Sequence, residues 1–363
     1  MGWIDSHCHI QGEYGSQWND PLDVIEDAAG SDVTGIVCVG TDLDTSREGI
    51  ELTLQLRNLL SRYSAQTSAV PDGVAEQVTN NLEAQRIGRL DQGVVHPGEQ
   101  SKAEEERQAG APARRRQTMT GSRHKVMATD CHAKFGEGQA RDVYLLNLLS
   151  RFGIWCTAGI HPHDATTWKD DIGELEKLIA TTLDNYPGML VGIGECGLDY
   201  HYENSSKESQ IAAFIAQIKL AKEYDLTLVI HAREAWDDIF AILATEGAPQ
   251  RSIMHCFTGG PDELSTALSF GAYISFSGII TFSNAANTRE AAKECPPERV
   301  LVETDSPFLS PTPNRGKPNR PAWVALVGDE IGALKGMSKA TIQDITYSNT
   351  LRAFKITAPN ERS

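Results

Sequence analysis

Short runs of apolar and β-branched residues recur along the chain and alternate with stretches of helical periodicity. There are eight such runs, at residues 3–9, 34–41, 154–162, 190–199, 226–232, 251–257, 272–278 and 300–308. The clearest helical stretch is 207–224, where Ile211, Phe214, Ile215 and Ile218 follow helical spacing. Strands that alternate with helices form parallel sheets, and eight such units close into a barrel. The sequence therefore predicts an α/β protein with a (β/α)8 TIM-barrel fold, whose active site lies at the carboxyl ends of the strands.

The spacing between the second and third runs is abnormal. More than a hundred residues separate them, whereas a helix with two loops needs roughly thirty. The octamer LRNLLSRY at 56–63 is nearly repeated as LLNLLSRF at 145–152. We therefore interpret residues 64–152 as an insert within a single domain of residues 1–363, on the barrel face opposite the active site. Its composition, dense in charge and turn residues, is typical of disordered or loosely folded segments.

The net charge limits how this chain could bind a polyanion. With 33 basic and 49 acidic residues the formal net charge is -16, which argues against a broad phosphate-binding surface. A polyanionic substrate would have to be attracted locally, and bound divalent cations would supply that attraction.

Cysteine usage and hydropathy indicate the compartment. The seven cysteines are scattered and odd in number, as in proteins with reduced thiols. The sequence contains no run of about 18 apolar residues, which a membrane-spanning helix would need. It also lacks the pattern of a signal peptide at the start. We expect a cytoplasmic protein without membrane contact or an obligate protein partner.

The first predicted strand ends in the pattern His-Cys-His at residues 7–9. Residues i and i+2 of a strand point to the same face, so His7 and His9 can reach one point while Cys8 turns away. A strand that merely carries two polar residues would show the same pattern. A metal site therefore requires further ligands elsewhere in the chain.

Other ionisable residues fall at or just after the later predicted strands. They are His161, His163, Glu195, His231, His255 and Asp305. Taken singly, each could be a satisfied core histidine or a hydrogen-bonded buried carboxylate. A barrel, however, brings all these strand ends to one mouth, and buried carboxylates are costly unless they are paired or bound to metal. The pair Cys131 and His132 in the insert lacks such partners, and we interpret it as a chance match.

The residue types in this set suit two divalent cations. A carboxylate can bridge two ions about 3.5–4 Å apart, and a water between them becomes the nucleophile. We assign Glu195 as the bridge, with a catalytic role shared by Asp305. The predicted ligands of the first ion are His7, His9, Glu195 and Asp305, and those of the second are Glu195, His231 and His255. Imidazole ligands favour Zn, Mn or Fe over Mg.

Six short motifs together resemble the TatD family of metal-dependent hydrolases. They are DSHCH, GIHPH, GECGLDY, HAREAWDDIFAIL, HCFTG and ETDSPFL, and the resemblance covers residues 3–63 and 153–356. The resemblance implies a TIM barrel of the amidohydrolase-like superfamily and a centre of two Mg, Mn or Zn ions. It also implies hydrolysis of DNA phosphodiester bonds, typically by 3′-to-5′ exonuclease action on single-stranded ends. The family's ligand set coincides with the assignment above, whereas the insert departs from the family pattern.

The remaining polar residues at the mouth are predicted to contact substrate. We expect His161 and His163 to face the scissile phosphate. Glu303 shares a strand face with Asp305 and is expected to orient a ligand or contact the product. The basic loop after Asp305 is the best candidate to hold a nucleic-acid backbone, through Arg315, Lys317 and Arg320.

Two other functions remain open at this point. The same barrel and metals can hydrolyse an amide, lactone or aminoacyl ester, although enzymes of that type commonly bridge their metals with a carbamylated lysine where this chain has Glu195. An inactive metal-binding scaffold is the third reading, with the insert as its interaction segment.

Deleting residues 64–152 tests the interpretation of the insert. We expect the catalytic constants to stay largely intact, because the segment would connect a helix to a strand on the face opposite the active site. Steady-state kinetics of the deletion variant, with circular dichroism to establish folding, provides the measurement. Loss of activity in a folded variant would show that the insert is misplaced.

Overall fold

The computed structural model describes residues 2–18, 21–67, 152–202 and 204–357. Its strands form one eight-stranded sheet in the order β1 to β8, and every neighbouring pair is parallel. The strands are β1 (Trp3–Cys8), β2 (Val33–Val39), β3 (Gly153–Ala158), β4 (Leu190–Asp199), β5 (Thr227–Arg233), β6 (Ser252–Met254), β7 (Tyr273–Phe276) and β8 (Val300–Val302). Each of the eight predicted runs overlaps one strand, and the predicted (β/α)8 barrel is confirmed.

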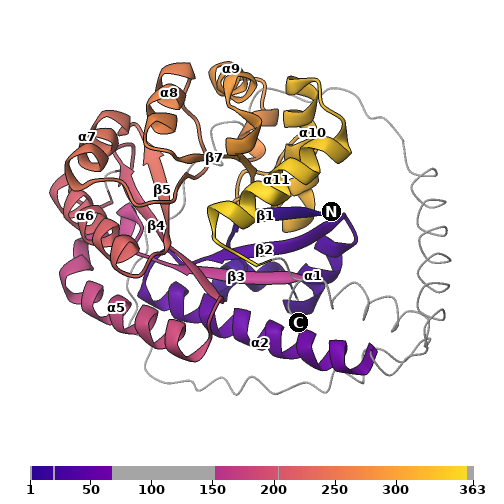
Figure 1. Ribbon diagram of the computed structural model, residues 1–363, viewed down its shortest axis with the longest axis horizontal. Coiled ribbons are helices and arrows are strands. Elements are labelled where there is room, and N and C mark those ends of the chain that lie inside the picture. Colours follow the sequence, from indigo (N-terminus) through magenta and orange to yellow (C-terminus); the bar gives the residue numbers. More distant parts are fainter. Residues whose placement is uncertain (1, 19–20, 68–151, 203, 358–363) are drawn as a thin grey trace. The chain divides into compact units, whose positions relative to one another are not determined.

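Helices lie around the outside of these strands (Figure 1). The α-helices are α1 (Pro21–Ala29), α2 (Leu43–Thr67), α5 (Trp168–Asn185), α6 (Lys207–Glu223), α7 (Trp236–Glu246), α8 (Pro261–Ser269), α9 (Ala286–Glu294), α10 (Val324–Lys335) and α11 (Lys339–Ala353). Short 3-10 helices are η1 (Gly12–Gln17), η3 (Pro162–Thr167), η4 (Gly278–Thr281), η5 (Pro297–Arg299) and η6 (Pro321–Trp323). Within the described residues, none of these helices combines the length and hydropathy needed to cross a bilayer.

Hydrogen bonds join the first strand to the segment that follows the last one. The backbone N–H of Asp305 donates to the carbonyl of His7 at 2.9 Å. The buried carboxylate of Asp5 accepts from the backbone N–H and the hydroxyl of Thr304, at 2.8 and 2.5 Å. These bonds hold Asp305 beside the strand that carries His7, although almost the whole chain separates the two residues.

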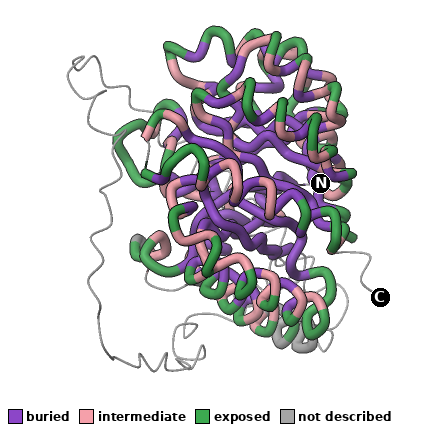
Figure 2. The backbone as a smooth tube through the Cα atoms, turned by 90° about the vertical axis from the view of Figure 1, so that its left-hand side faces the viewer, coloured by how far each residue is buried: buried purple, intermediate pink, exposed green. Residues whose placement is uncertain are grey.

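Apolar side chains fill the interior of the barrel. Buried residues follow the strands through the middle of the protein, and exposed residues lie on the outer helices (Figure 2). The core cluster includes Ile4, Val37, Trp155, Val191, Val229, Ile253 and Leu301, one from each of seven strands. Helix α11 packs against the amino ends of the strands, where Asn349 donates to the Val300 carbonyl at 2.7 Å. The amino end is thereby closed, and the polar residues at the carboxyl ends are left to form a site.

Two glycines give β4 a backbone path that other residues would not tolerate. Gly194 and Gly197 flank the Glu195–Cys196 pair with φ values of +127° and +139°. A Cβ atom at Gly197 would lie 2.1 Å from the backbone oxygen of His231, and one at Gly194 would lie 2.4 Å from that of Val229. Glycine is therefore required here both for conformation and for close approach to β5.

The chain divides into two units, Met1–Ser61 with Arg151–Ser363, and Arg62–Ser150. Helix α2 continues to Thr67, so it extends past the predicted start of the insert at residue 64. The rest of the predicted insert up to residue 151, including Cys131 and His132, lies outside the described residues. Its assignment stays a prediction.

Replacing Gly197 with alanine should destabilise the barrel by about 1–3 kcal/mol or more, because strained backbone and a steric clash coincide at this position. Urea unfolding followed by circular dichroism measures the change in the free energy of unfolding. The matched control is Gly173→Ala in α5, where a Cβ atom meets nothing within 4 Å. The free energy of unfolding of that control should rise by about 0.5–1 kcal/mol. Equal stabilities of the two variants would contradict the requirement for glycine at position 197.

Candidate metal centre

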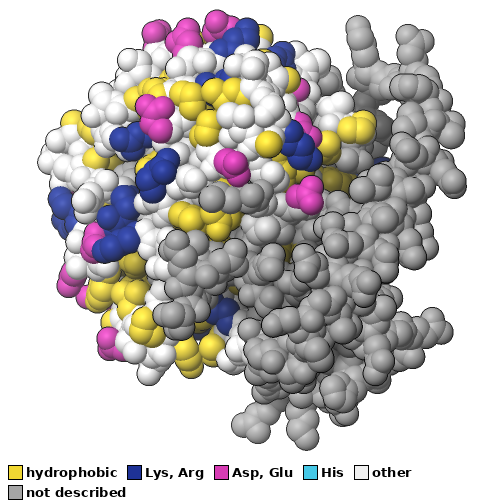
Figure 3. Space-filling view, turned by 45° about the vertical axis from the view of Figure 1, so that its right-hand side comes forward, with side chains coloured by type: hydrophobic (Ala, Val, Ile, Leu, Met, Phe, Trp, Pro, Cys, Tyr) yellow, Lys and Arg dark blue, Asp and Glu magenta, His cyan; other side chains and the backbone are white. Residues whose placement is uncertain are grey.

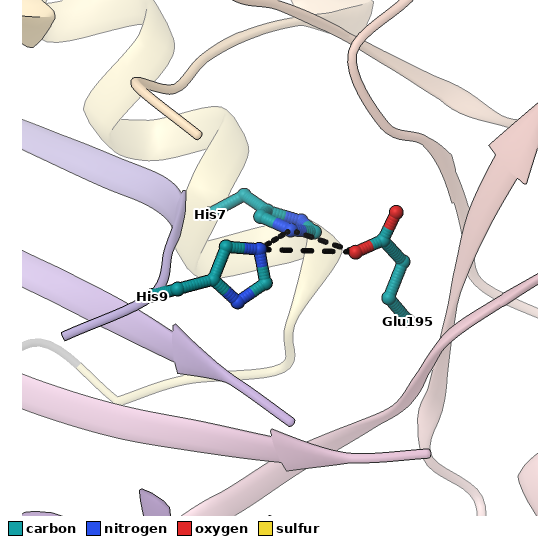
Figure 4. Close-up of side chains that lie close together, drawn as sticks. All are labelled: His7, His9 and Glu195. Carbon is teal, nitrogen blue, oxygen red and sulfur yellow. Dashed lines mark hydrogen bonds and ion pairs between the residues drawn. The ribbon is translucent and has the colours of Figure 1, made fainter. Parts of the chain in front are cut away.

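His7 and His9 turn their rings toward the carboxylate of Glu195 (Figure 4). Their Nε2 atoms lie 3.3 Å apart and are 3.4 and 3.8 Å from Oε2 of Glu195. Cys8 faces the other way, and its thiol donates to the carbonyl of Val37 at 3.4 Å. The alternation of side chains in β1 thus aims both imidazoles at one point, as the sequence predicts.

Asp305 completes this first group of ligand atoms. Its Oδ1 lies 3.8 Å from Nε2 of His7 and 3.3 Å from Nε2 of His9. Atoms coordinated tetrahedrally at about 2.0–2.2 Å from an ion lie about 3.3–3.6 Å from one another. The observed separations of 3.3–3.8 Å are therefore those of atoms that could share one cation.

The other oxygen of Glu195 faces a second group of imidazoles. Oε1 lies 2.8 Å from Nδ1 of His231 and 3.1 Å from Nε2 of His255. Nε2 of His161 is 3.4 Å from the same oxygen. His161 is predicted from the sequence to contact substrate, but this position also makes it a candidate ligand, since His161, Glu195 and His231 could hold an ion together.

Further carboxylates hold these histidines from behind. Oε1 of Glu303 lies 2.8 Å from Nδ1 of His255 and accepts a hydrogen bond from the backbone N–H of Cys256 at 2.8 Å. Because Glu303 is fully buried, it can fix the ring of His255 with Nε2 toward Glu195. Such outer carboxylates commonly set the tautomer and orientation of a metal-ligating histidine.

Burial and the neighbouring charges set the protonation of the cluster. Burial lowers the pKa of His7 to about 3, and His255 adds to the shift. Burial also lowers the pKa of His161 to about 4, against the opposing effect of Glu195. For Glu195 burial acts to raise the pKa, but His255 and His161 outweigh it and hold that pKa well below its usual range. Neutral imidazole and ionised carboxylate are the forms that bind metal ions.

The donor atoms fit divalent cations. Imidazole nitrogens and carboxylate oxygens suit Zn and Mn, and the carboxylates also suit Mg. Nδ1 of His7 and Oε2 of Glu303 are buried, and neither has a hydrogen-bond partner among the described residues. Together with His255 these two residues form a further group that could hold an ion. Burial acts to lower the pKa of His9, His231 and His255, but the carboxylates outweigh it and raise the pKa of each ring, so a cation that binds here would displace protons from these rings. The donor set makes the cluster a candidate cation site.

The structure gathers part of the predicted substrate-contact set. His161 and Glu303 lie within the cluster, and Nε2 of His163 contacts Oδ2 of Asp199 at 2.9 Å beside it.

The three cations of the predicted basic loop have different surroundings. The guanidinium of Arg320 pairs with Asp27 of α1 at 3.3 Å, and that of Arg315 stacks 3.7 Å from the centroid of Phe282, whereas Lys317 is exposed. That these cations bind a nucleic-acid backbone stays a prediction. Asp27 already neutralises part of the charge of Arg320.

Asp199 is a site residue that the sequence analysis missed. Its Oδ2 lies 2.9 Å from Nε2 of His163 and 3.2 Å from Nε2 of His231. Burial acts to raise its pKa, but the hydrogen bonds from His163 and His231 hold the pKa well below its usual range. The signal was present in the sequence, because Asp199 ends the same predicted strand that carries Glu195.

Arg233 was missed as well. Its guanidinium stacks 4.5 Å from the centroid of the Tyr202 ring, and that ring lies 5.4 Å from the ring of His163. A half-buried cation at the end of β5 is therefore within reach of the mouth. It is a further candidate for holding a phosphate.

A parallel eight-stranded barrel with such a cluster at the carboxyl ends of its strands is the architecture of a metal-dependent hydrolase. The family described as TatD related DNase matches residues 95–355. The chain belongs to the TatD family of metal-dependent hydrolases. The match begins well after His7 and His9, which the tertiary structure brings to the matched part of the site.

Relatives and solved structures agree with this family. The uncharacterized metal-dependent hydrolase YabD of Bacillus subtilis is 42% identical over 205 residues, covering 56% of this chain and 78% of that protein. The 3'-5' ssDNA/RNA exonuclease TatD of Pectobacterium parmentieri is 34% identical over 208 residues, with coverages of 56% and 78%. A hydrolase TatD family protein from Entamoeba histolytica shares the fold, with a TM-score of 0.65, 18% identity and coverages of 98% and 99%.

Replacing Glu303 with glutamine should weaken metal binding about 10–100-fold, because changes to groups that orient a ligand cost this much. Titration of the metal-free protein with Zn or Mn against a chromophoric chelator measures the affinity. Glu234→Gln is the matched control, since Glu234 is exposed and contacts His201 outside the cluster. Equal affinities of both variants and the parent protein would contradict the orienting role.

Proposed function

We propose that this protein hydrolyses phosphodiester bonds of DNA at single-stranded 3′ ends, using two divalent cations. The observation that carries the proposal is the division of Glu195 between two groups. One carboxylate oxygen faces His7 and His9, and the other faces His231 and His255. A carboxylate in this position can bridge two ions, as in the two-metal sites of phosphatases and nucleases.

The proposed ligand sets follow from these distances. His7, His9, Glu195 and Asp305 would hold the first ion. Glu195, His231 and His255 would hold the second ion, with His161 as an additional ligand or as a contact to the scissile phosphate. When bound, such ions supply a water of lowered pKa and positive charge for the oxygens of the phosphate. Mg, Mn and Zn all fit these donors.

The surrounding residues would prepare the site for the reaction. Glu303 orients His255 and Asp199 orients His231, so both imidazoles keep their positions during turnover. Nε2 of His163 is held by Asp199 at 2.9 Å, and its partly exposed ring faces the mouth beside Tyr202. In this position His163 and Arg233 can bind a non-bridging oxygen of the substrate.

Charge and family relationships support a nucleic-acid substrate that is held locally. The net charge is -16, and on the face in Figure 3 basic and acidic side chains are interspersed. A protein of this charge gains little from general attraction to DNA, so the cations and a few mouth residues must hold the phosphate. The family description names a DNase, and the Pectobacterium relative is named as an exonuclease acting on ssDNA and RNA.

Carbonyl hydrolysis is the alternative reaction for such a barrel. Strand β4 reads LVGIGECGLD, so it offers a carboxylate and no lysine for carbamylation. This observation favours phosphoryl transfer over hydrolysis of an amide, lactone or aminoacyl ester.

The Glu195→Gln variant tests the proposal directly. Mutating a residue that only hydrogen-bonds to a metal ligand lowers metal affinity or activity about 10–100-fold. Loss of the bridging carboxylate itself should therefore lower kcat/KM by more than about 100-fold. The barrel should stay folded by circular dichroism, and elemental analysis after dialysis should show less bound metal. Full activity in this variant would remove Glu195 from the bridging role.

The assay should separate the candidate reactions. Metal-loaded protein is incubated with 5′-labelled single-stranded DNA, with the same DNA blocked by a 3′-terminal phosphorothioate, and with an aminoacyl ester. Shortening from the unblocked 3′ end supports the proposal, whereas turnover of the ester alone supports the alternative. Turnover of neither substrate by protein of confirmed metal content would favour a scaffold.

A further inference from the structure

Phe308 exposes an aromatic ring beside the metal cluster. Its exposed fraction is 43%, and the only other large apolar side chain exposed to this degree among the described residues is Tyr186, at 40%. Tyr186 lies after α5, in a helix-to-strand connection, whereas Phe308 lies three residues after Asp305. A single exposed apolar side chain is common on protein surfaces, but its place beside the metal cluster makes Phe308 a candidate contact for a ligand.

The backbone holds Phe308 in this exposed position. Its N–H donates to the carbonyl of Asp305 at 2.9 Å. Its own carbonyl accepts a hydrogen bond from the side-chain amide of Asn319 at 2.7 Å, and Asn319 is fully buried. The exposure is therefore built into the loop after β8, and the segment cannot readily turn inward to hide the ring.

Tyr14 provides a second ring from a different loop. It lies on η1, and its centroid is 5.9 Å from that of Phe308 with the planes at 75°. Both rings contact the ligand His9, at centroid distances of 5.3 Å for Tyr14 and 6.3 Å for Phe308. Tyr14 and Phe308, which we call the aromatic rim, thus stand at the edge of the first ligand group.

The charges around the rim argue against a phosphate there. Glu13 neighbours Tyr14 in the chain, and the carboxylate of Glu48 lies so close to Gly12 that a Cβ atom would be 2.0 Å from its Oε2. These carboxylates lie on or beside η1, which carries Tyr14, and disfavour a phosphate there, while apolar rings attract flat uncharged groups. A nucleobase has these properties, and aromatic side chains stack on any base because every base has a π-face.

We propose that the aromatic rim seats the nucleobase of the terminal nucleotide, with Phe308 as the stacking ring; this inference rests on the proposed function. The phosphate would then lie at the cations, and the adjoining base would lie against Phe308 over His9. Such a seat holds the end of a single strand without reading its sequence.

The test compares Phe308→Ala with the parent protein on two oligonucleotides. One ends in a normal 3′ nucleotide, and the other carries a tetrahydrofuran abasic residue at that end. On the normal end we expect KM to rise roughly five- to a hundredfold with little change in kcat, as for a lost stacking contact that serves binding. On the abasic end, where no base is present to stack, Phe308→Ala should have the same KM as the parent protein.

Two other variants at the same position separate stacking from general apolar contact. Phe308→Trp should keep the parent KM, because it retains a planar ring, and Phe308→Leu should behave like alanine. Tyr186→Ala is the matched control, with similar exposure on a remote connection, and should leave both substrates unaffected.

The outcomes distinguish this inference from the proposed function. If the parent protein cleaves both oligonucleotides and Phe308→Ala matches it on each, the seat is wrong while the nuclease function stands. An equal loss on normal and abasic ends, or full activity in Phe308→Leu, would also overturn base stacking. If the metal-loaded parent protein cleaves neither oligonucleotide, the proposed function fails and this inference falls with it.

Discussion

The site depends on one buried carboxylate. Glu195 is only 4% exposed, and an ionised carboxylate that deep is unstable unless positive charge or hydrogen bonds compensate for the lost water. Its two oxygens are compensated from different sides, one by His7 of β1 and His9 just after it, and the other by His231 of β5 and His255 just after β6. The protein surrounds this anion with groups that bind cations, and this arrangement makes a two-ion centre the natural interpretation.

The barrel architecture brings these groups together although, apart from His7 and His9, they lie far apart in the chain. Parallel strands end on the same face of the barrel, so residues at the ends of different strands lie together at one mouth. Gly194 and Gly197, which flank Glu195–Cys196, let β4 pass close to β5. The hydrogen bonds that Thr304 donates to the Asp5 carboxylate hold Asp305 beside β1. The same backbone contacts at the carboxyl end therefore stabilise the barrel and position the site. Helix α11 packs at the opposite, amino end.

The charge distribution suggests how an acidic protein can handle a polyanion. In the proposed function attraction would be concentrated at the cations, Asp199 and Glu303 would orient the histidines, and rings such as Phe308 would contact the substrate. The proposed preference for single-stranded ends agrees with this arrangement, because a protein of net charge -16 gains little from general attraction to a duplex.

The sequence by itself determined the strand order, the existence of a barrel and the convergence of His7 and His9. These follow from local periodicity, which needs only neighbouring residues. Tertiary structure decided which carboxylate oxygen faces which histidine, that His161 lies beside the second group, that Asp199 contacts His163, and that Arg320 pairs with Asp27. Such contacts join residues far apart in the chain, and their partners depend on side-chain direction and loop path, which local patterns do not encode.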